Sequence, residues 1–132
     1  MIVVDSSVWI DYFNGNINKQ TDWLNNALGT EPIIIGDIIL AEVLQGFQSD
    51  KDFKIAKKLL LEFQYMDMVG QDIALKSVDN YRALRQRGVT VRKTIDVMIG
   101  TFCIHHKFTL LHNDKDFEPI EKHLKLKTIK II

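Results

Sequence analysis

The sequence has one cysteine, no long hydrophobic run and no excess of either charge. Because Cys103 is alone, the chain cannot form an internal disulfide, which suits a reducing cytoplasm. No apolar run approaches the ~20 residues that a transmembrane helix needs. The first residues also lack the basic segment of a secretory signal. We therefore expect a soluble, cytoplasmic protein without a membrane partner.

The charge balance removes one common argument for nucleic-acid binding. Lys and Arg number 17, as do Asp and Glu, so the formal net charge is zero. A nucleic-acid site would therefore need a local basic patch. No glycine-rich loop follows the first apolar run, so neither dinucleotide binding nor P-loop nucleotide binding is expected.

The overall composition is typical of a single folded domain. The 132 residues are 46% hydrophobic and 26% charged, which is enough to bury a core without disulfides. The chain has no internal repeat, no low-complexity tract and no linker rich in glycine, proline or serine. We predict one domain spanning residues 1–132.

Short apolar runs separated by helical patterns predict the fold class. Three β-branched runs indicate buried strands, at residues 2–4, 33–35 and 129–132. Weaker strand patterns occupy residues 65–69 and 108–112. Strands that alternate with helices predict an α/β sandwich around a mostly parallel sheet.

Helical spacing between these runs predicts which side chains face the core. Ile55 and Leu60 belong to one apolar stripe, and Ala74 and Val78 belong to another. A nearly all-apolar helix begins near Thr94 and is expected to be buried.

Acidic residues stand in unusual positions in this pattern. Each has a structural alternative: an N-cap for Asp5, a favourable helix dipole for Asp96 and the rim of an apolar face for Glu42. Asp5 and the "HNDKDF" turn both follow strands, so they should meet at one edge of a parallel sheet. The five acids are Asp5, Glu42, Asp96, Asp114 and Asp116.

Taken together, these acids indicate a metal site. Four convergent carboxylates would repel one another strongly without a cation, and their oxygens suit Mg²⁺ or Mn²⁺. His105 and His106 are neighbours on a helix and point apart, while His112 and His123 are isolated. An acidic site of this kind suits hydrolysis of phosphodiester bonds.

The motifs resemble a known family nearly from end to end. The match is to the PIN-domain ribonucleases, and in particular to the VapC-type toxins of type II toxin–antitoxin pairs. The resemblance implies a three-layer α/β/α sandwich, Mg²⁺- or Mn²⁺-dependent cleavage of RNA, and inhibition by a small VapB-like antitoxin. The matching segments are "VVDSSVWIDYF", "LAEVLQGF" and "TIDVMIGTFCIHHKFTLLHNDKDF".

The resemblance also implies roles for individual residues. Asp5 and Asp96 match the principal metal ligands, and Glu42 matches the third catalytic acid. The fourth acid is Asp114 or Asp116; we favour Asp114 and expect Asp116 nearby, where it caps the short helix before Phe117. The polar positions that support the site in this family match Ser6 and Thr94.

Two further segments have predicted binding roles. The segment from 81 to 93 is basic and leads directly into Asp96, so Arg87, Arg92 and Lys93 are candidates for binding RNA phosphates. A solvated helix face is the alternative for the arginines earlier in the segment. The stripe that includes Tyr12 and Phe13 is either core or part of a groove for an antitoxin or a second copy in a homodimer.

Three other functions remain as alternatives. A haloacid-dehalogenase phosphatase also begins with a strand and an aspartate, but it needs a second acid where this chain has Ser7. A PIN nuclease of RNA processing and a non-catalytic PIN-like interaction module are the other two. A small antitoxin gene immediately upstream would favour the toxin, whose target is tRNA, rRNA or mRNA.

Overall fold

A four-stranded parallel sheet forms the centre of the protein, described here from a computed structural model over residues 1–131. The strands are ordered β3-β2-β1-β4, and each neighbouring pair is parallel. Their bounds are β1 (Ile2–Val4), β2 (Ile33–Gly36), β3 (Gln64–Met66) and β4 (Thr109–Leu111). The central pair is buried on both faces, as strands between two helical layers should be.

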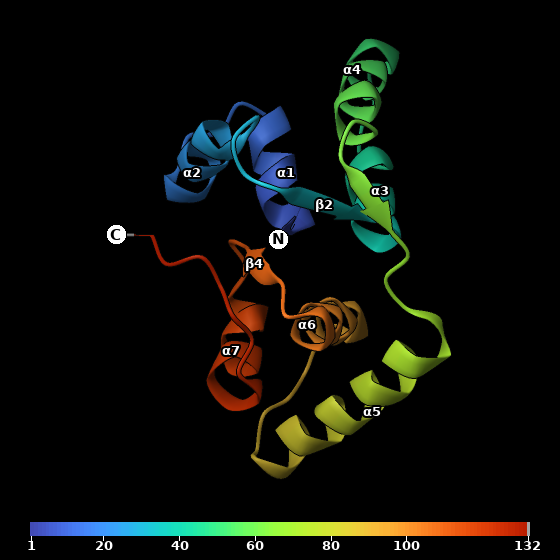
Figure 1. Cartoon of the computed structure of the whole chain (residues 1–132), viewed down its shortest axis with the longest axis vertical. Helices are drawn as coiled ribbons and strands as arrows, with labels where there is room; N and C mark the ends of the chain where they lie inside the picture. Colours follow the sequence, from blue (N-terminus) through green and yellow to red (C-terminus); the bar gives the residue numbers. More distant parts are fainter. Residues whose placement is uncertain (132) are drawn as a thin grey trace.

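Helices cover both faces of this sheet, which confirms the predicted three-layer α/β/α architecture. Figure 1 shows α1 to α4 in the upper part of the view and α5 to α7 in the lower part, with the strands between them. The helices are α1 (Ser6–Phe13), α2 (Lys19–Ala27), α3 (Asp37–Leu44), α4 (Asp50–Leu60), α5 (Gly70–Gln86), α6 (Thr94–His106) and α7 (Glu118–Leu124), with the 3-10 helix η1 (Lys115–Phe117) before α7. Among residues 1–131, none of these helices combines the length and the apolar character that a membrane span requires.

The predicted strands are mostly confirmed, with one error at the C-terminal end. The runs at 2–4 and 33–35 form β1 and β2, while 108–112 and 65–69 each contain a shorter strand, β4 and β3. The predicted strand at 129–132 is wrong for its described part: Thr128 makes one isolated parallel bridge to Leu110. The partner strand β4 is only three residues long, so it has few backbone groups to extend this pairing. Residue 132 lies outside the described residues.

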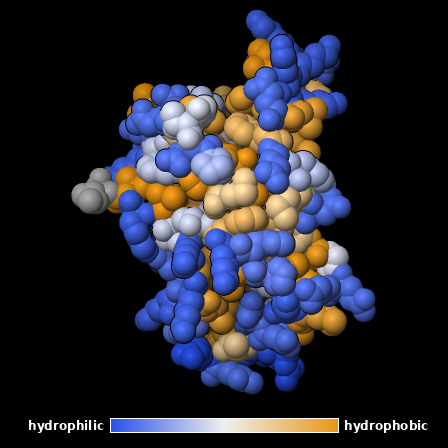
Figure 2. Space-filling model, viewed as in Figure 1, coloured by the Kyte–Doolittle hydropathy of each residue, from blue (hydrophilic) through white to orange (hydrophobic). Residues whose placement is uncertain are grey.

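The helical stripes were predicted less accurately than the strands. Ile55 and Val78 are 57% and 54% exposed, so neither belongs to the core. On α4 the buried positions are Ala56 and Leu60, so the prediction for Leu60 is confirmed, and on α5 the buried positions include Ser77. The spacing of apolar residues identifies a stripe, but on α4 and α5 it does not say which of two neighbouring stripes packs inward. Figure 2 shows mostly hydrophilic residues over α4, at the top of the view.

The helix α2 is absent from the predicted elements, although its start carries a readable signal. Asn18 accepts a hydrogen bond from the Thr21 backbone N–H, and Thr21 Oγ1 accepts one from the Asn18 backbone N–H. This reciprocal pair is a capping box with threonine in place of the usual glutamate. A search for the common capping box, which has glutamate at this position, would therefore miss this one.

The strand order determines where a functional site can form. The chain passes from β1 to β2 and β3 on one side, and later returns to β4 on the other side of β1. Val4 and Leu111 are register partners, so the residues that follow β1 and β4 leave the sheet side by side. The carboxyl ends of strands next to such a reversal are where open α/β sheets bind ligands.

The orientation of α1 supplies a first prediction. Trp9 is fully buried and stacks on Phe13 with ring centroids 5.8 Å apart, whereas Ile10 is 39% exposed. Trp9→Ala should therefore lower the free energy of unfolding by about 3–5 kcal/mol, because a large cavity would remain. Ile10→Ala should cost less than about 1 kcal/mol. Urea denaturation measures both, and similar losses for the two variants would contradict this orientation.

Candidate functional site

Asp5 occupies the junction between β1 and α1 and caps the helix. Its Oδ2 accepts a hydrogen bond from the Ser7 backbone N–H at 3.0 Å, and its own N–H donates to the carbonyl of Leu111 at 2.9 Å. The residue is only 3% exposed. The structural alternative for Asp5 is thus correct, but one capping bond leaves the other carboxylate oxygen available for a site.

The two serines after Asp5 connect α1 to the other parts of the site. Ser6 Oγ donates a hydrogen bond to Glu42 Oε1 at 3.2 Å, which links α1 to α3. Ser7 Oγ accepts one from the Asn113 backbone N–H at 3.1 Å, which links α1 to the loop after β4. Ser6 was a predicted supporting residue, whereas the contact of Ser7 was not predicted. Both bonds join segments that are far apart in the sequence, so the local "DSS" pattern gives no signal of either partner.

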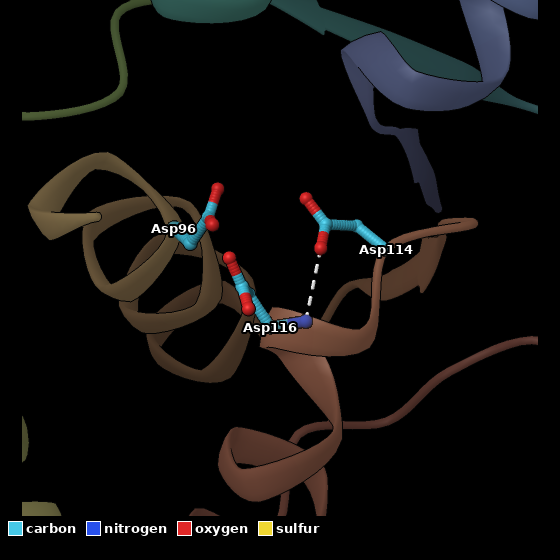
Figure 3. Close-up of side chains that lie close together, drawn as sticks. All are labelled: Asp96, Asp114 and Asp116. Atoms are coloured by element: carbon cyan, nitrogen blue, oxygen red, sulfur yellow. Dashed lines mark hydrogen bonds between the residues drawn. The ribbon is translucent and has the colours of Figure 1, made fainter. Parts of the chain in front are cut away.

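Three aspartates from two distant segments converge beside this junction. One oxygen from each of Asp96, Asp114 and Asp116 lies within 4.8 Å of the others. Figure 3 shows Asp96 on the first turn of α6 facing Asp114 and Asp116, which lie at the start of η1. Both candidates for the fourth acid therefore belong to the cluster.

The prediction that Asp116 caps the short helix is wrong. Asp114 is the cap, because its Oδ1 accepts a hydrogen bond from the Asp116 backbone N–H at 2.9 Å. The turn places the cap one residue before Lys115, where the backbone is still extended. An N-cap requires this non-helical backbone, which Asp116, inside the turn, does not have.

Burial and mutual repulsion raise the pKa values of Asp5, Glu42 and Asp96, whereas the pKa of Asp114 is lowered, because burial is outweighed by hydrogen bonds from the Asp116 backbone N–H and from Lys93. Burial, opposed by the charge of Lys93 and reinforced by the charges of Asp114, Asp5 and Asp116, raises the pKa of Asp96 to about 7. Burial also raises the pKa of Asp5, and Asp114 adds to that effect. The pKa of Glu42 rises through burial and then through the charge of Asp5. The acids named from the sequence therefore share one electrostatic environment.

The cluster has buried oxygens without hydrogen-bond partners. Within residues 1–131, Asp96 Oδ2 and Asp116 Oδ2 are both buried and accept no hydrogen bond. Leaving a carboxylate oxygen in this state is costly unless a cation neutralises it. The donors are all carboxylate oxygens, which hard divalent cations such as Mg²⁺ and Mn²⁺ prefer. The residues present thus fit a divalent metal ion.

Two of the predicted RNA-binding residues lie against these acids. Lys93 Nζ is 3.3 Å from Asp114 Oδ2 and 3.9 Å from both Asp96 Oδ2 and Asp116 Oδ2. Arg92 Nη2 lies 3.5 Å from Asp116 Oδ1. Their side chains are 57% and 77% exposed, so both also face solvent.

Two other residues predicted from the sequence, Arg87 and Thr94, lie at the edge of the site. Arg87 is exposed at the C-terminal end of α5, and Thr94 is the exposed first residue of α6. Thr94 lines an apolar pocket between α5 and α6, together with Tyr81. The structure does not bring either residue into contact with the carboxylates described above.

His112 supports the loop that carries Asp114, a role that the sequence did not indicate. Its Nδ1 accepts a hydrogen bond from the Asp114 backbone N–H at 3.2 Å, and its ring packs on Phe117. Burial lowers the pKa of His112, which keeps the ring neutral and able to accept this bond. An isolated histidine after a strand gives no signal of such a contact.

The sequence matches the PIN domain family over residues 2–122. It is 27% identical over 124 residues to ribonuclease VapC11 of Mycobacterium tuberculosis, and the match covers 92% of each chain. The fold is similar to that in VapBC2 from Rickettsia felis bound to a DNA fragment from its promoter, with a TM-score of 0.77, 18% identity and full coverage of both chains. It is also similar to FitAcB from Neisseria gonorrhoeae, with a TM-score of 0.74, 15% identity, and coverage of 98% of this chain and 97% of that one.

The raised pKa of Asp96 predicts how the stability of the metal-free protein depends on pH. Between an ordinary value of 3.8 and about 7, the folded state keeps a proton that the unfolded state has lost. The free energy of unfolding should therefore fall as pH rises through this range. Asp96→Asn removes this contribution, so in EDTA at pH 8 the variant should be more stable by on the order of 2–4 kcal/mol.

Denaturant titrations of both proteins from pH 4 to pH 8 measure this difference. It should nearly vanish at pH 4, where the native carboxyl is protonated. Asp79→Asn is the matched control, because Asp79 is exposed on α5. If Asp96→Asn is destabilised at every pH, Asp96 has a structural role at the helix start and the electrostatic interpretation is wrong.

Proposed function

The chain belongs to the PIN-domain family, and we propose that it is a metal-dependent endoribonuclease and the toxin of a type II toxin–antitoxin pair. The observation that carries this proposal is the convergence of three aspartates beside the ends of β1 and β4, where two buried carboxylate oxygens accept no hydrogen bond in the described residues. Relatives at 27% identity are named as VapC ribonucleases, which supports RNA as the substrate. The solved structures support the fold.

The metal would be held by the aspartates at the edge of the sheet. Asp96, Asp114 and Asp116 have oxygens close enough to share one ion, and Asp5 is close enough to Asp114 for the charge of Asp114 to raise the pKa of Asp5. Mg²⁺ or Mn²⁺ at this site would activate a water molecule and neutralise charge on the leaving oxygen.

Glu42 differs from the aspartates and has a different proposed role. Its carboxylate is oriented by Ser6 and is only partly buried, so one part of it faces solvent at the site. Burial and the charge of Asp5 raise the pKa of Glu42, which makes it a better proton acceptor. We assign Glu42 the task of accepting the proton from the attacking water.

Positive residues next to the acids would hold the RNA. Arg92 is highly exposed and reaches Asp116, so it can contact a phosphate that lies over the cluster. Lys93 lies against the same acids, and Arg87, at the end of α5 and apart from the acids, would extend the phosphate-binding surface along the same segment. Binding through these residues should weaken as salt rises, because counterions are released from the RNA.

An apolar pocket between α1 and α3 is the proposed site for the antitoxin. It is lined by residues that include Ile10, Phe13, Val43 and Phe47. A small VapB-like protein with an amphipathic helix would place its apolar face here. A toxin–antitoxin complex from Klebsiella pneumoniae has a similar fold, which supports a partner of this kind. We also propose that the protein forms a homodimer, because Leu75 and Val78 expose apolar surface on α5.

The activity is tested with purified protein, total cellular RNA, and Mg²⁺, Mn²⁺ or EDTA. We expect cleavage with either metal and none in EDTA. Asp5→Asn should lower the cleavage rate by more than about 100-fold, since loss of a residue that only supports a metal ligand already costs 10–100-fold. Asparagine caps helices as well as aspartate, so this variant should fold.

Asp79→Asn, purified in the same way, is the control for this assay and should cleave at the wild-type rate. Cleavage that persists in EDTA, or equal rates for Asp5→Asn and wild type, would refute the proposed site. Absence of cleavage by all three proteins would favour a non-catalytic module.

The antitoxin pocket is tested by co-expression with the product of a small gene immediately upstream, where the genome carries one. Ile10→Asp should abolish co-purification, because a buried charge would face the apolar helix of the partner. The variant should keep its thermal stability, since Ile10 is partly exposed in the free protein. Co-purification at the wild-type level would place the partner elsewhere.

A further inference from the structure

Lys93 lies where its ammonium group interacts with three carboxylates at once. We propose that Lys93 is a tethered counter-ion that competes with the divalent metal for the acidic cluster and leaves the cluster when the metal binds. This inference rests on the metal site of the proposed function. A residue that only contacts RNA phosphates would not compete with the metal in this way.

The geometry favours competition because the ammonium and a metal ion would need the same oxygens. Lys93 Nζ is 3.9 Å from Asp96 Oδ2 and from Asp116 Oδ2, the two buried oxygens that accept no hydrogen bond. It is nearer, at 3.3 Å, to Asp114 Oδ2. Asp96 is itself 6% exposed, so its charge has little access to water. A divalent ion bound to these oxygens would repel an ammonium only a few ångströms away.

The side chain of Lys93 is free to move out of the cluster. It is 57% exposed and makes no hydrogen bond, within residues 1–131, other than the one to Asp114. Lysine carries a compact charge on a flexible stem, so it can exchange carboxylates for another anion without a change in the backbone. The nearest such anion during the proposed reaction is the RNA phosphate above the metal.

Arg92 provides an internal comparison. It is the neighbouring residue and has the same charge, but its side chain is 77% exposed and meets only Asp116, at 3.5 Å. It does not approach Asp96 or Asp114 within the distance of an ion pair in the described residues. Loss of its charge should therefore affect the metal much less than loss of Lys93.

The test is calorimetric titration of MnCl₂ into protein stripped of metal with EDTA and dialysed. Lys93→Met removes the charge and keeps a similar length. It should bind Mn²⁺ about tenfold more tightly than wild type, a modest effect because solvent and salt screen the exposed lysine. Arg92→Met, the matched control, should change the dissociation constant by less than about threefold. Lys93→Arg keeps the charge and should bind like wild type.

Thermal melts separate competition from a purely structural role. Without metal, Lys93→Met should melt at a lower temperature than wild type, because three carboxylates lose their counter-ion. With saturating Mn²⁺ the two melting temperatures should coincide. A structural role for Lys93 would lower both melting temperatures equally.

The outcomes distinguish this inference from the function on which it rests. Equal or weaker Mn²⁺ binding by Lys93→Met, with normal binding by wild type, would overturn the role of Lys93 and leave the metal site intact. If wild-type protein binds no Mn²⁺, both the metal site and the role of Lys93 are overturned. Neither result depends on finding an RNA that the protein cleaves.

Discussion

The fold must hold several negative charges close together in a partly buried site, and this arrangement costs free energy. Burial is the leading cause of the raised pKa values of Asp5, Glu42 and Asp96, and repulsion from neighbouring acids adds to it. Such a site is maintained only where the surrounding fold leaves the acids no freedom to separate. The parallel pairing of β1 with β4 provides this constraint, because Val4 and Leu111 are fixed partners and their successors leave the sheet together. The closeness of these negative charges is then a property that the fold imposes on the site.

Three consecutive residues after β1 connect the end of this strand to the rest of the site. Asp5 is fixed to the start of α1, Ser6 contacts Glu42 on α3, and Ser7 binds the backbone of Asn113. Elements that are far apart in the sequence are therefore held at one point by a continuous run of short polar side chains. Short side chains suit this function because they have few rotamers to lose on ordering. Substitution within the run would disturb several parts of the site at once.

The sequence was sufficient for the four strands of the sheet, although it added a false one at the C-terminal end, and it singled out acids that the fold brings close together. It was not sufficient for the partners of individual side chains. Continuous β-branched runs identify buried parallel strands directly, and strand ends then place Asp5 and Asp114 together. Ile55 illustrates what spacing cannot supply, since two overlapping apolar stripes on α4 are equally regular and only packing selects one. Lys93 illustrates a second limit: a cation near acids in the sequence indicates proximity, whereas its contact with three separate carboxylates arises only after α6 and η1 meet. The capping role of Asp114 rather than Asp116 depends on backbone angles that sequence patterns do not determine.

The hydrogen bonds divide the four aspartates into two kinds, and this division explains how the site can be both rigid and receptive. Asp5 and Asp114 each use one oxygen to accept a hydrogen bond from a backbone N–H, which fixes the orientation of the carboxylate and leaves the second oxygen for the site. Asp96 and Asp116 each have a buried Oδ2 that accepts no such bond in the described residues. Backbone hydrogen bonds therefore orient the first pair, whereas the buried oxygens of the second pair have only the Lys93 ammonium nearby, 3.9 Å away, and a metal cation would complete their environment. Backbone hydrogen bonds orient only two of these four aspartates. The fold therefore determines where a cation would bind, and the cation itself must balance the remaining negative charge. A site fully satisfied by hydrogen bonds would be more stable in the free protein, but it would have no unsatisfied oxygen with which to bind an ion.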